Sequence, residues 1–375
     1  MSKATLTSLI ASCLCLGCVR ETRPVTPPLH TIAEGPWTPT ETTSARFGMK
    51  RLGEVPNSGL QLPAVSPDGR WIALLEVGSP EPVPPAAMFS GKGLEQVSLT
   101  LRSLKDDGKE RVVCEAGACW PAWSPDGQWL AFIVYNEGKC RLAVHDLFEA
   151  TTKRIELDAA TAAMPAFSPH GRQIALVVDP DRPGECRLLL LNPRTGETLP
   201  SPRVDEMEQV LLPQYASADT LMFLGRRNGH TCLYRWSLRE RTPRRLYDIP
   251  IPAKLTQAAQ AFAGIAQPLS PDGRTLAWYD VRTDRIVLLD ISTGEQRSLK
   301  PRSRAGCWFG PASFVAATDK ELLLAQVRKP ERKNLLRGQW LPRWADPQTS
   351  QMLLLTRGSD PWRFGLLRFE LLSDP

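Results

Sequence analysis

Residues that could perform catalysis are scarce in this chain of 375 residues. It has four histidines, and no two of them have the spacing of a metal-binding pair. It also lacks a Gly-x-Ser-x-Gly nucleophile elbow, a phosphate-binding loop and an acidic loop with calcium spacing. The sequence therefore predicts no catalytic residue, no metal and no cofactor. An enzyme whose ligands come from separate repeats stays open as an alternative, because a single sequence would hide it.

Cysteine chemistry offers one candidate disulfide. Cys140, Cys186 and Cys232 recur every 46 residues and are interpreted as small apolar residues of equivalent strands. Cys114 and Cys119 flank a short loop that could close, so this pair is the one candidate disulfide in an oxidising compartment, and two separate thiols are the alternative.

A repeated nine-residue stretch organises the chain. Each clear copy places Ser-Pro-Asp-Gly, or once Ser-Pro-His-Gly, before an alternating apolar run. The copies begin at Ser66, Ser124, Ser168 and Ser270. Proline presets φ in such a turn, and glycine supplies the positive φ that a hairpin needs. Self-similarity at this period indicates a repeat architecture.

Three weaker copies complete the series. They start at Tyr215, Trp308 and Trp344, and the first fills the interval of 102 residues between Ser168 and Ser270. Each unit of about 40 to 50 residues holds four short apolar or closing segments, as in a propeller blade. We therefore predict an all-β fold, a single β-propeller of four-stranded blades. Seven blades are expected by count, with six as the alternative because the last two units are weak.

The turn and the strand after it resemble the WD-like propeller repeat of the TolB-type family, which also occurs in the propeller domains of prolyl oligopeptidases. The resemblance covers roughly residues 47–372. We expect neither the small α/β domain of TolB nor the hydrolase domain of the oligopeptidases. The resemblance implies the fold and a protein-binding habit, without naming a partner.

Residues 1–18 resemble a lipoprotein signal peptide. An apolar run from Ala4 to Leu16 is too short to span a bilayer, and it ends in Leu16-Gly17-Cys18. The resemblance implies a lipid anchor on Cys18, with Cys13 as the alternative site. A plain secretory signal or a buried N-terminal strand would explain the same apolar run. Val19 follows the expected anchor, and in lipoprotein families the absence of aspartate there implies sorting to the outer membrane, facing the periplasm.

The remaining chain divides into a tether and the propeller. Residues 19–46 are rich in proline and threonine and should remain extended. Residues 47–375 form the propeller. We expect Arg46–Leu60 to pair with Phe364–Leu371 and so close the ring.

Partner-binding candidates lie in the connections between middle strands. Blade one has a long insertion with Met88 and Phe89, and such loops are often functional. The equivalent loops of later blades present arginines, which interfaces favour. These are Arg182, Arg226, Arg227 and Arg282. A family-specific insertion and solvated hairpin ends would explain the same residues.

Tryptophans form the second set of candidates. Trp120, Trp123, Trp308 and Trp344 precede or enter the first strand of their unit, which should line the central channel. Stacked indoles could hold a sugar or a peptide there. Space filling between blades is the alternative.

Charge excludes one class of partner. The net charge of +6 comes from 46 basic and 40 acidic residues spread thinly along the chain, whereas nucleic-acid binding needs a denser basic stripe. The sequence thus predicts a non-catalytic envelope lipoprotein whose propeller binds a protein or an envelope component. A polysaccharide or peptide binder, or a channel-site hydrolase or lyase, remains the alternative.

Overall fold

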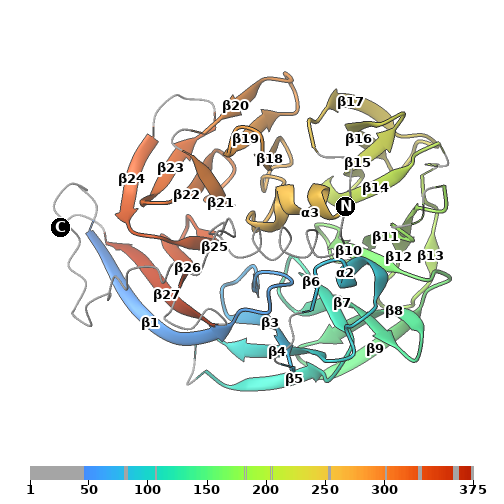
Figure 1. The fold of residues 1–375 in the computed structure, drawn as a ribbon, viewed down its shortest axis with the longest axis horizontal. Coiled ribbons are helices and arrows are strands. Elements are labelled where there is room, and N and C mark those ends of the chain that lie inside the picture. Colours follow the sequence, from blue (N-terminus) through green and yellow to red (C-terminus); the bar gives the residue numbers. More distant parts are fainter. Residues whose placement is uncertain are drawn as a thin grey trace, which may run out of the picture.

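A computed structural model describes residues 46–79, 83–105, 108–180, 182, 184–202, 204, 206–251, 255–299, 302–327, 332–357 and 363–372. The predicted signal peptide, nearly all of the tether and the lipidation sites lie outside these residues. Within them the chain forms seven antiparallel sheets arranged around a central axis (Figure 1). The prediction of a seven-bladed β-propeller is confirmed, and the six-bladed alternative is wrong.

The first four blades follow one another along the chain. Blade one contains β2 (Ala64–Val65), β3 (Trp71–Val77), β4 (Val97–Ser103) and β5 (Glu110–Cys114). Blade two contains β6 (Ala118–Trp123), β7 (Trp129–Asn136), β8 (Lys139–Asp146) and β9 (Thr151–Glu156). Blade three contains β10 (Ala162–Phe167), β11 (Ile174–Val178), β12 (Arg187–Leu191) and β13 (Thr198–Leu199). Blade four contains β14 (Gln209–Ser217), β15 (Thr220–Arg227), β16 (His230–Ser237) and β17 (Arg244–Asp248).

The last three blades include the closure of the ring. Blade five contains β18 (Thr275–Asp280), β19 (Arg285–Asp290) and β20 (Gln296–Ser298), with only a bridge from Leu269 to Leu276 in place of a first strand. Blade six contains β21 (Ser303–Trp308), β22 (Ser313–Thr318), β23 (Glu321–Gln326) and β24 (Arg332–Arg337). Blade seven contains β25 (Leu341–Asp346), β26 (Gln351–Arg357), β27 (Arg363–Leu372) and the N-terminal β1 (Arg46–Pro56).

Strand β1 closes the ring as expected. It runs antiparallel to β27, from the pair Arg46–Leu372 to the pair Pro56–Arg363. One sheet therefore contains both ends of the propeller sequence, and the chain that leaves β1 leads directly into blade one, which ties the last blade to the first.

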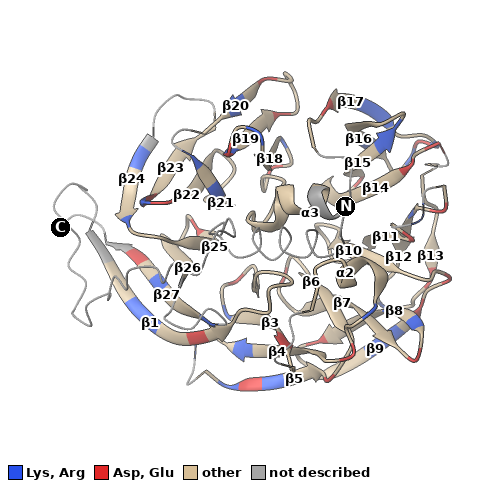
Figure 2. Ribbon diagram, in the orientation of Figure 1, with Lys and Arg blue, Asp and Glu red and all other residues tan. Residues whose placement is uncertain are grey.

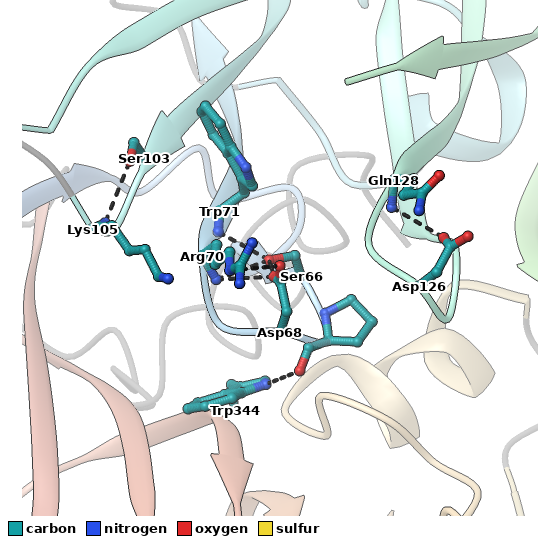
Figure 3. Close-up of polar contacts among 10 residues, drawn as sticks. Ser66, Asp68, Arg70, Trp71, Ser103, Lys105, Asp126, Gln128 and Trp344 are labelled. Carbon is teal, nitrogen blue, oxygen red and sulfur yellow. Dashed lines mark hydrogen bonds and ion pairs between the residues drawn. The ribbon is translucent and has the colours of Figure 1, made fainter. Parts of the chain in front are cut away.

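The repeated turn is built by its serine and aspartate. The Ser66 hydroxyl donates to Asp68 Oδ1 at 2.6 Å and accepts the Trp71 N–H at 2.9 Å (Figure 3). The same pair of bonds recurs at Ser124 and Ser270. These bonds need no contact with another blade, because all partners lie within five residues.

Side chains between neighbouring blades make up the core. Leu74 of blade one, for example, packs in one cluster with Leu353 and Leu354 of blade seven and with Val315 of blade six. Burial of apolar surface between adjacent sheets is the main stabilising term, since one blade alone cannot cover both of its faces.

The two ends of the ring differ. The turns between first and second strands, including 66–70 and 124–128, lie at one end, here called the turn end. Connections between second and third strands, and between blades, lie at the opposite end because antiparallel strands reverse direction. This end carries the helices of the described chain, α2 (Ala87–Ser90) and α3 (Leu255–Ala263), and is called the helix end. Both helices appear near the middle of the ring (Figure 1).

Neither of these helices could cross a membrane, and no other helix among the described residues could do so.

Candidate functional site

The insertion of blade one folds onto blade two. Its short helix α2 is capped by Gly91, where an added Cβ atom would come within 2.4 Å of the Tyr135 ring. The Trp120 indole N–H donates to the Met88 carbonyl at 2.7 Å, and the Phe89 ring meets the Trp120 ring edge-on at 5.2 Å. These contacts tie the insertion to the first strand of the next blade.

This packing corrects the expected role of Met88 and Phe89. We expected an irregular loop that offers both side chains to a partner, but Met88 is 3% and Phe89 5% exposed. The reason is that a helical turn directs both apolar side chains toward the ring, where they join the core. Neither residue offers surface for direct contact with a partner.

Helix α3 covers the neighbouring part of the helix end. Ala258, Ala261 and Phe262 are buried in one cluster with Leu269 and Trp278 of blade five. The helix thus supports blade five on the side where its first strand is reduced to a bridge. The sequence did not predict it, because the expected unit contained strands alone.

All four predicted arginines lie at the helix end, and each has a carboxylate partner. The pairs are Arg182–Glu185 at 3.2 Å, Arg226–Glu208 at 3.0 Å, Arg227–Glu206 at 2.6 Å and Arg282–Asp280 at 3.2 Å. The side chains of Arg182, Arg227 and Arg282 are 51%, 54% and 68% exposed, whereas Arg226 is 20% exposed. Exposed ion pairs are worth about 0–1 kcal/mol, so the three exposed guanidinium groups can exchange their partners at low cost.

A stronger ion pair, missed in the sequence, joins blades five and six. Arg304 of β21 donates to both oxygens of Asp284 at 2.7 Å and 2.9 Å, and the Tyr279 hydroxyl donates to the same carboxylate at 2.7 Å. Donation from Arg304 holds the pKa of Asp284 below its usual range. Bidentate geometry fixes the Asp284 hairpin against the first strand of blade six.

Two of the predicted tryptophans donate hydrogen bonds to a neighbouring blade, and a third packs within its own blade. Trp123 donates to the Ala64 carbonyl at 3.0 Å, and Trp344 donates to the Pro67 carbonyl at 2.9 Å (Figure 3). Trp308 is buried against Phe314, with ring centroids 4.9 Å apart. These contacts favour the space-filling interpretation for Trp123, Trp308 and Trp344. Trp120 lies nearer the helix end, where its indole N–H donates to the Met88 carbonyl of α2.

Strained backbone marks the first strands of blades two, three and four. Trp120, Met164 and Leu212 have φ values of 55°, 55° and 52°, and each directly precedes a proline. Residues before proline prefer extended backbone, and such outliers cluster at functional sites. Each one lies where the register between the first and second strand breaks. In the sequence, these strained positions are signalled by the proline that recurs ahead of the repeated turn.

One cationic residue of the first strands has no carboxylate partner among the described residues. Arg343 of β25 donates from Nε to the Pro63 carbonyl at 3.1 Å, and its Nη1 is buried without a hydrogen-bond partner in the described part of the chain. Burial lowers the pKa of Arg343 to about 10. Nothing in the local sequence distinguishes this residue from a surface arginine.

Basic residues on the outer strands have another role. Lys153, Arg154, Arg244, Arg245, Lys333 and Arg337 are exposed on the outermost strands of their blades (Figure 2). Charged side chains on edge strands oppose pairing with other chains. They surround the circumference and do not form one dense face.

The cysteines of the described chain are all buried, and no disulfide joins them. Cys114 donates from Sγ to the Ala116 carbonyl at 3.1 Å, and burial raises the pKa of Cys119 well above its usual value. The Cys114–Cys119 disulfide therefore stays a prediction for an oxidising compartment. Among the described residues, no group of three or more His, Cys, Asp or Glu side chains could hold a metal ion.

Comparison with known proteins shows the fold alone. No family model matches the chain. The propeller domain of the Trilobed protease from Pyrococcus furiosus is 13% identical with a TM-score of 0.53, covering 87% of this chain and 97% of that domain. Oligogalacturonate lyase in complex with manganese is 13% identical with a TM-score of 0.54, covering 88% and 96%. All of these are β-propeller likenesses at low identity.

Two further structures contain more than the shared ring. TolB from Acinetobacter baumannii is 17% identical with a TM-score of 0.43, and the match covers 75% of this chain and 61% of that protein. An acylaminoacyl peptidase from Pyrococcus horikoshii is 14% identical with a TM-score of 0.53, and the match covers 84% of this chain and 52% of that protein. The chain thus spans little more than half of these proteins.

Proposed function

We propose that this chain is a non-catalytic scaffold of the cell envelope, held to a membrane through a lipidated Cys18, and that it binds a protein partner at its helix end. The observation that carries the proposal is the direction of β1. Its first residue, Arg46, pairs with Leu372, and Gly48 pairs with Glu370, which in turn pairs with Gln351 beside the β25–β26 turn. The N-terminal segment therefore joins the ring at the turn end. An anchored ring would leave its helix end free on the opposite side.

The chemistry of the helix end supports a protein partner. Arg182, Arg227 and Arg282 are exposed there in weak local ion pairs. Arginine is enriched at interfaces, and its guanidinium can donate two parallel hydrogen bonds to one carboxylate. Helix α3 packs against blade five, whose β18–β19 connection carries Arg282. A partner with acidic side chains could take over the guanidinium groups without new ordering of the ring.

The test is crosslinking and capture from intact envelopes, comparing two sets of charge reversals. The helix-end variant carries Arg182→Glu, Arg227→Glu and Arg282→Glu. The matched control carries Arg70→Glu and Arg239→Glu, which are exposed turn-end arginines with aspartate partners at 3.3 Å each. We expect a discrete protein partner that the helix-end variant loses and the control retains.

Two results would contradict the proposal. If only the turn-end control lost the partner, the docking face would lie at the turn end. If no protein were captured, the chain would not act as a scaffold. Mass spectrometry of the purified protein for a lipid on Cys18, with Cys18→Ser as control, tests the anchor separately. An unmodified Cys18 in the membrane fraction would exclude it.

A further inference from the structure

The connections between third and fourth strands lie at the turn end, because antiparallel strands reverse direction at each hairpin. In blade two this connection is 147–150, and in blade four it is 238–243. Arg46 and Leu372, at the two ends of the ring sequence, pair with each other at the same end. The N-terminal segment therefore enters the ring on the side that carries these two connections.

The connection of blade two holds an apolar side chain in solvent. Phe148 is 90% exposed, the highest value among the exposed large apolar residues of the described chain. Asp146 Oδ1 accepts the N–H groups of Phe148 and Glu149 at 2.8 Å and 3.0 Å. The Leu147 N–H donates to the Gln128 carbonyl at 2.9 Å, which joins the connection to the repeated turn. An ordered turn thus presents the Phe148 ring to the solvent.

Positive charge is spread around the ring, but the outer hairpin of blade four concentrates it (Figure 2). Arg235 and Arg244 lie directly opposite each other in the β16–β17 pairing, and Arg241 lies in the connection between these strands. All three are exposed, and no ion pair joins them to another described residue. The Trp236 indole N–H donates to the Glu240 carbonyl at 2.9 Å and so orders the connection. Like charges directly opposite each other destabilise a sheet, so an anion at this hairpin would be stabilising.

The neighbouring carboxylates do not compensate this charge. Asp219 binds Arg239 at 3.3 Å, and Asp248 forms an ion pair with Arg245. Glu240 is the one carboxylate of the connection 238–243. The hairpin and Asp219 together contain five arginines and three carboxylates, which leaves a net charge of +2.

We propose that the turn end rests on an anionic phospholipid surface, with the Phe148 ring inserted among the headgroups and Arg235, Arg241 and Arg244 on lipid phosphates. An apolar ring gains by leaving water at the boundary of headgroups and acyl chains, and basic residues are attracted to anionic lipids. The choice of a membrane rests on the lipid anchor of the proposed function, since the N-terminal segment enters the ring at this end. A tether also keeps the surface close to the lipid, so a weak affinity is enough to orient the ring.

Sedimentation with vesicles tests this surface without the anchor. The full chain carrying Cys18→Ser is mixed with phosphatidylcholine vesicles that contain or lack phosphatidylglycerol. We expect tighter binding where phosphatidylglycerol is present, and loss of this preference at high salt, because salt screens exposed charges. The N-terminal apolar run is common to all variants in this background, so differences between them belong to the ring.

Charge removal at two places locates the basic part of the surface. The first variant replaces the three arginines of blade four, Arg235→Gln, Arg241→Gln and Arg244→Gln. The matched control removes the same charge from exposed residues of the helix end, Lys92→Gln, Lys139→Gln and Arg187→Gln. We expect the blade-four variant to bind phosphatidylglycerol vesicles about tenfold or more weakly than the parent chain. The control should bind like the parent.

The apolar part is tested in the same way. Phe148→Ser should weaken binding about tenfold, because the ring no longer leaves water. Val281→Ser is the matched control, since Val281 is 46% exposed in the β18–β19 connection at the helix end. It should bind like the parent.

Three results would overturn the proposal. The parent chain could bind both kinds of vesicle equally, or the blade-four and Phe148 variants could bind like their controls. Alternatively, these variants could lose a crosslinked envelope protein while their vesicle binding stays unchanged, which would assign the surface to a protein. Each result is separate from the proposed function, because the anchor is absent from this assay and the helix-end arginines are intact in every chain.

Discussion

The glycine of the repeated turn meets two separate requirements. Gly69 and Gly171 have φ values of 65° and 66°, which side chains other than glycine adopt at a cost of about 1–2 kcal/mol. At Gly69 a Cβ atom would also lie 2.8 Å from the Trp344 ring, whereas at Gly171 nothing lies within 4 Å. Backbone strain is thus common to both turns, and contact with a neighbouring blade is special to the first.

These two glycines allow the strain and the contact to be separated. We expect Gly171→Ala to lower the free energy of unfolding by about 1–2 kcal/mol. Gly69→Ala should lower it by at least about 1 kcal/mol more, because the Trp344 ring must move and its bond to Pro67 is disturbed. Urea unfolding followed by tryptophan fluorescence measures both values. Equal losses would show that Trp344 does not pack on the Gly69 turn.

Closure of the ring depends on a single element, β1. Val55 near its end is fully buried in the cluster formed by blades one, six and seven, whereas Met49 in the same strand is 44% exposed. Strand β1 thus packs against the core through one face, and it pairs with β27 along its length.

Truncation of a buried residue in β1 tests this closure. Val55→Ala should lower the free energy of unfolding by about 2 kcal/mol, because two methyl groups leave the core and a cavity remains. Met49→Ala should change it by no more than about 0.5 kcal/mol. Thermal and urea unfolding of both variants give the comparison. If Val55→Ala were as mild as Met49→Ala, β1 would not be docked in solution.

At the scale of the whole ring, all described cysteines are inside. They come from blades one, two, three, four and six, and each is 5% exposed or less. Burial also raises the pKa of the Cys114, Cys119, Cys140, Cys232 and Cys307 thiols, that of Cys307 to about 12, so the reactive thiolate of these five is rare at neutral pH. Reaction of these cysteines therefore reports unfolding of the ring.

Iodoacetamide labelling with peptide mass mapping uses this property. In the native protein we expect Cys114, Cys119, Cys140, Cys186, Cys232 and Cys307 to stay unlabelled, and to become labelled together in denaturant. A pair that stays unlabelled in denaturant without a reductant, at Cys114 and Cys119 only, would establish the predicted disulfide. Labelling of one blade ahead of the others would show that the ring does not unfold as a unit.

Sequence by itself determined the repeated turn and the closing strand, and it favoured seven blades over six. The turn needs only Ser66, Asp68 and Gly69 within a few residues, so its chemistry is complete in the local sequence. The predicted closing pair, Arg46–Leu60 with Phe364–Leu371, agrees with β1 and β27 within a few residues. A ring of repeated units must join its ends, and that requirement needs no side-chain detail.

Only the tertiary structure decided which residues form a site. Met88 and Phe89 are buried because Trp120 of the next blade lies beneath them, and Trp344 is fixed by the carbonyl of Pro67 across the closure. Arg343 stands out only because blade one supplies one acceptor and no described blade supplies a carboxylate. Such contacts join residues up to 280 positions apart, as for Arg343 and Pro63. Local patterns fix the hairpin, but packing between blades sets burial and charge compensation, and those quantities define a binding site.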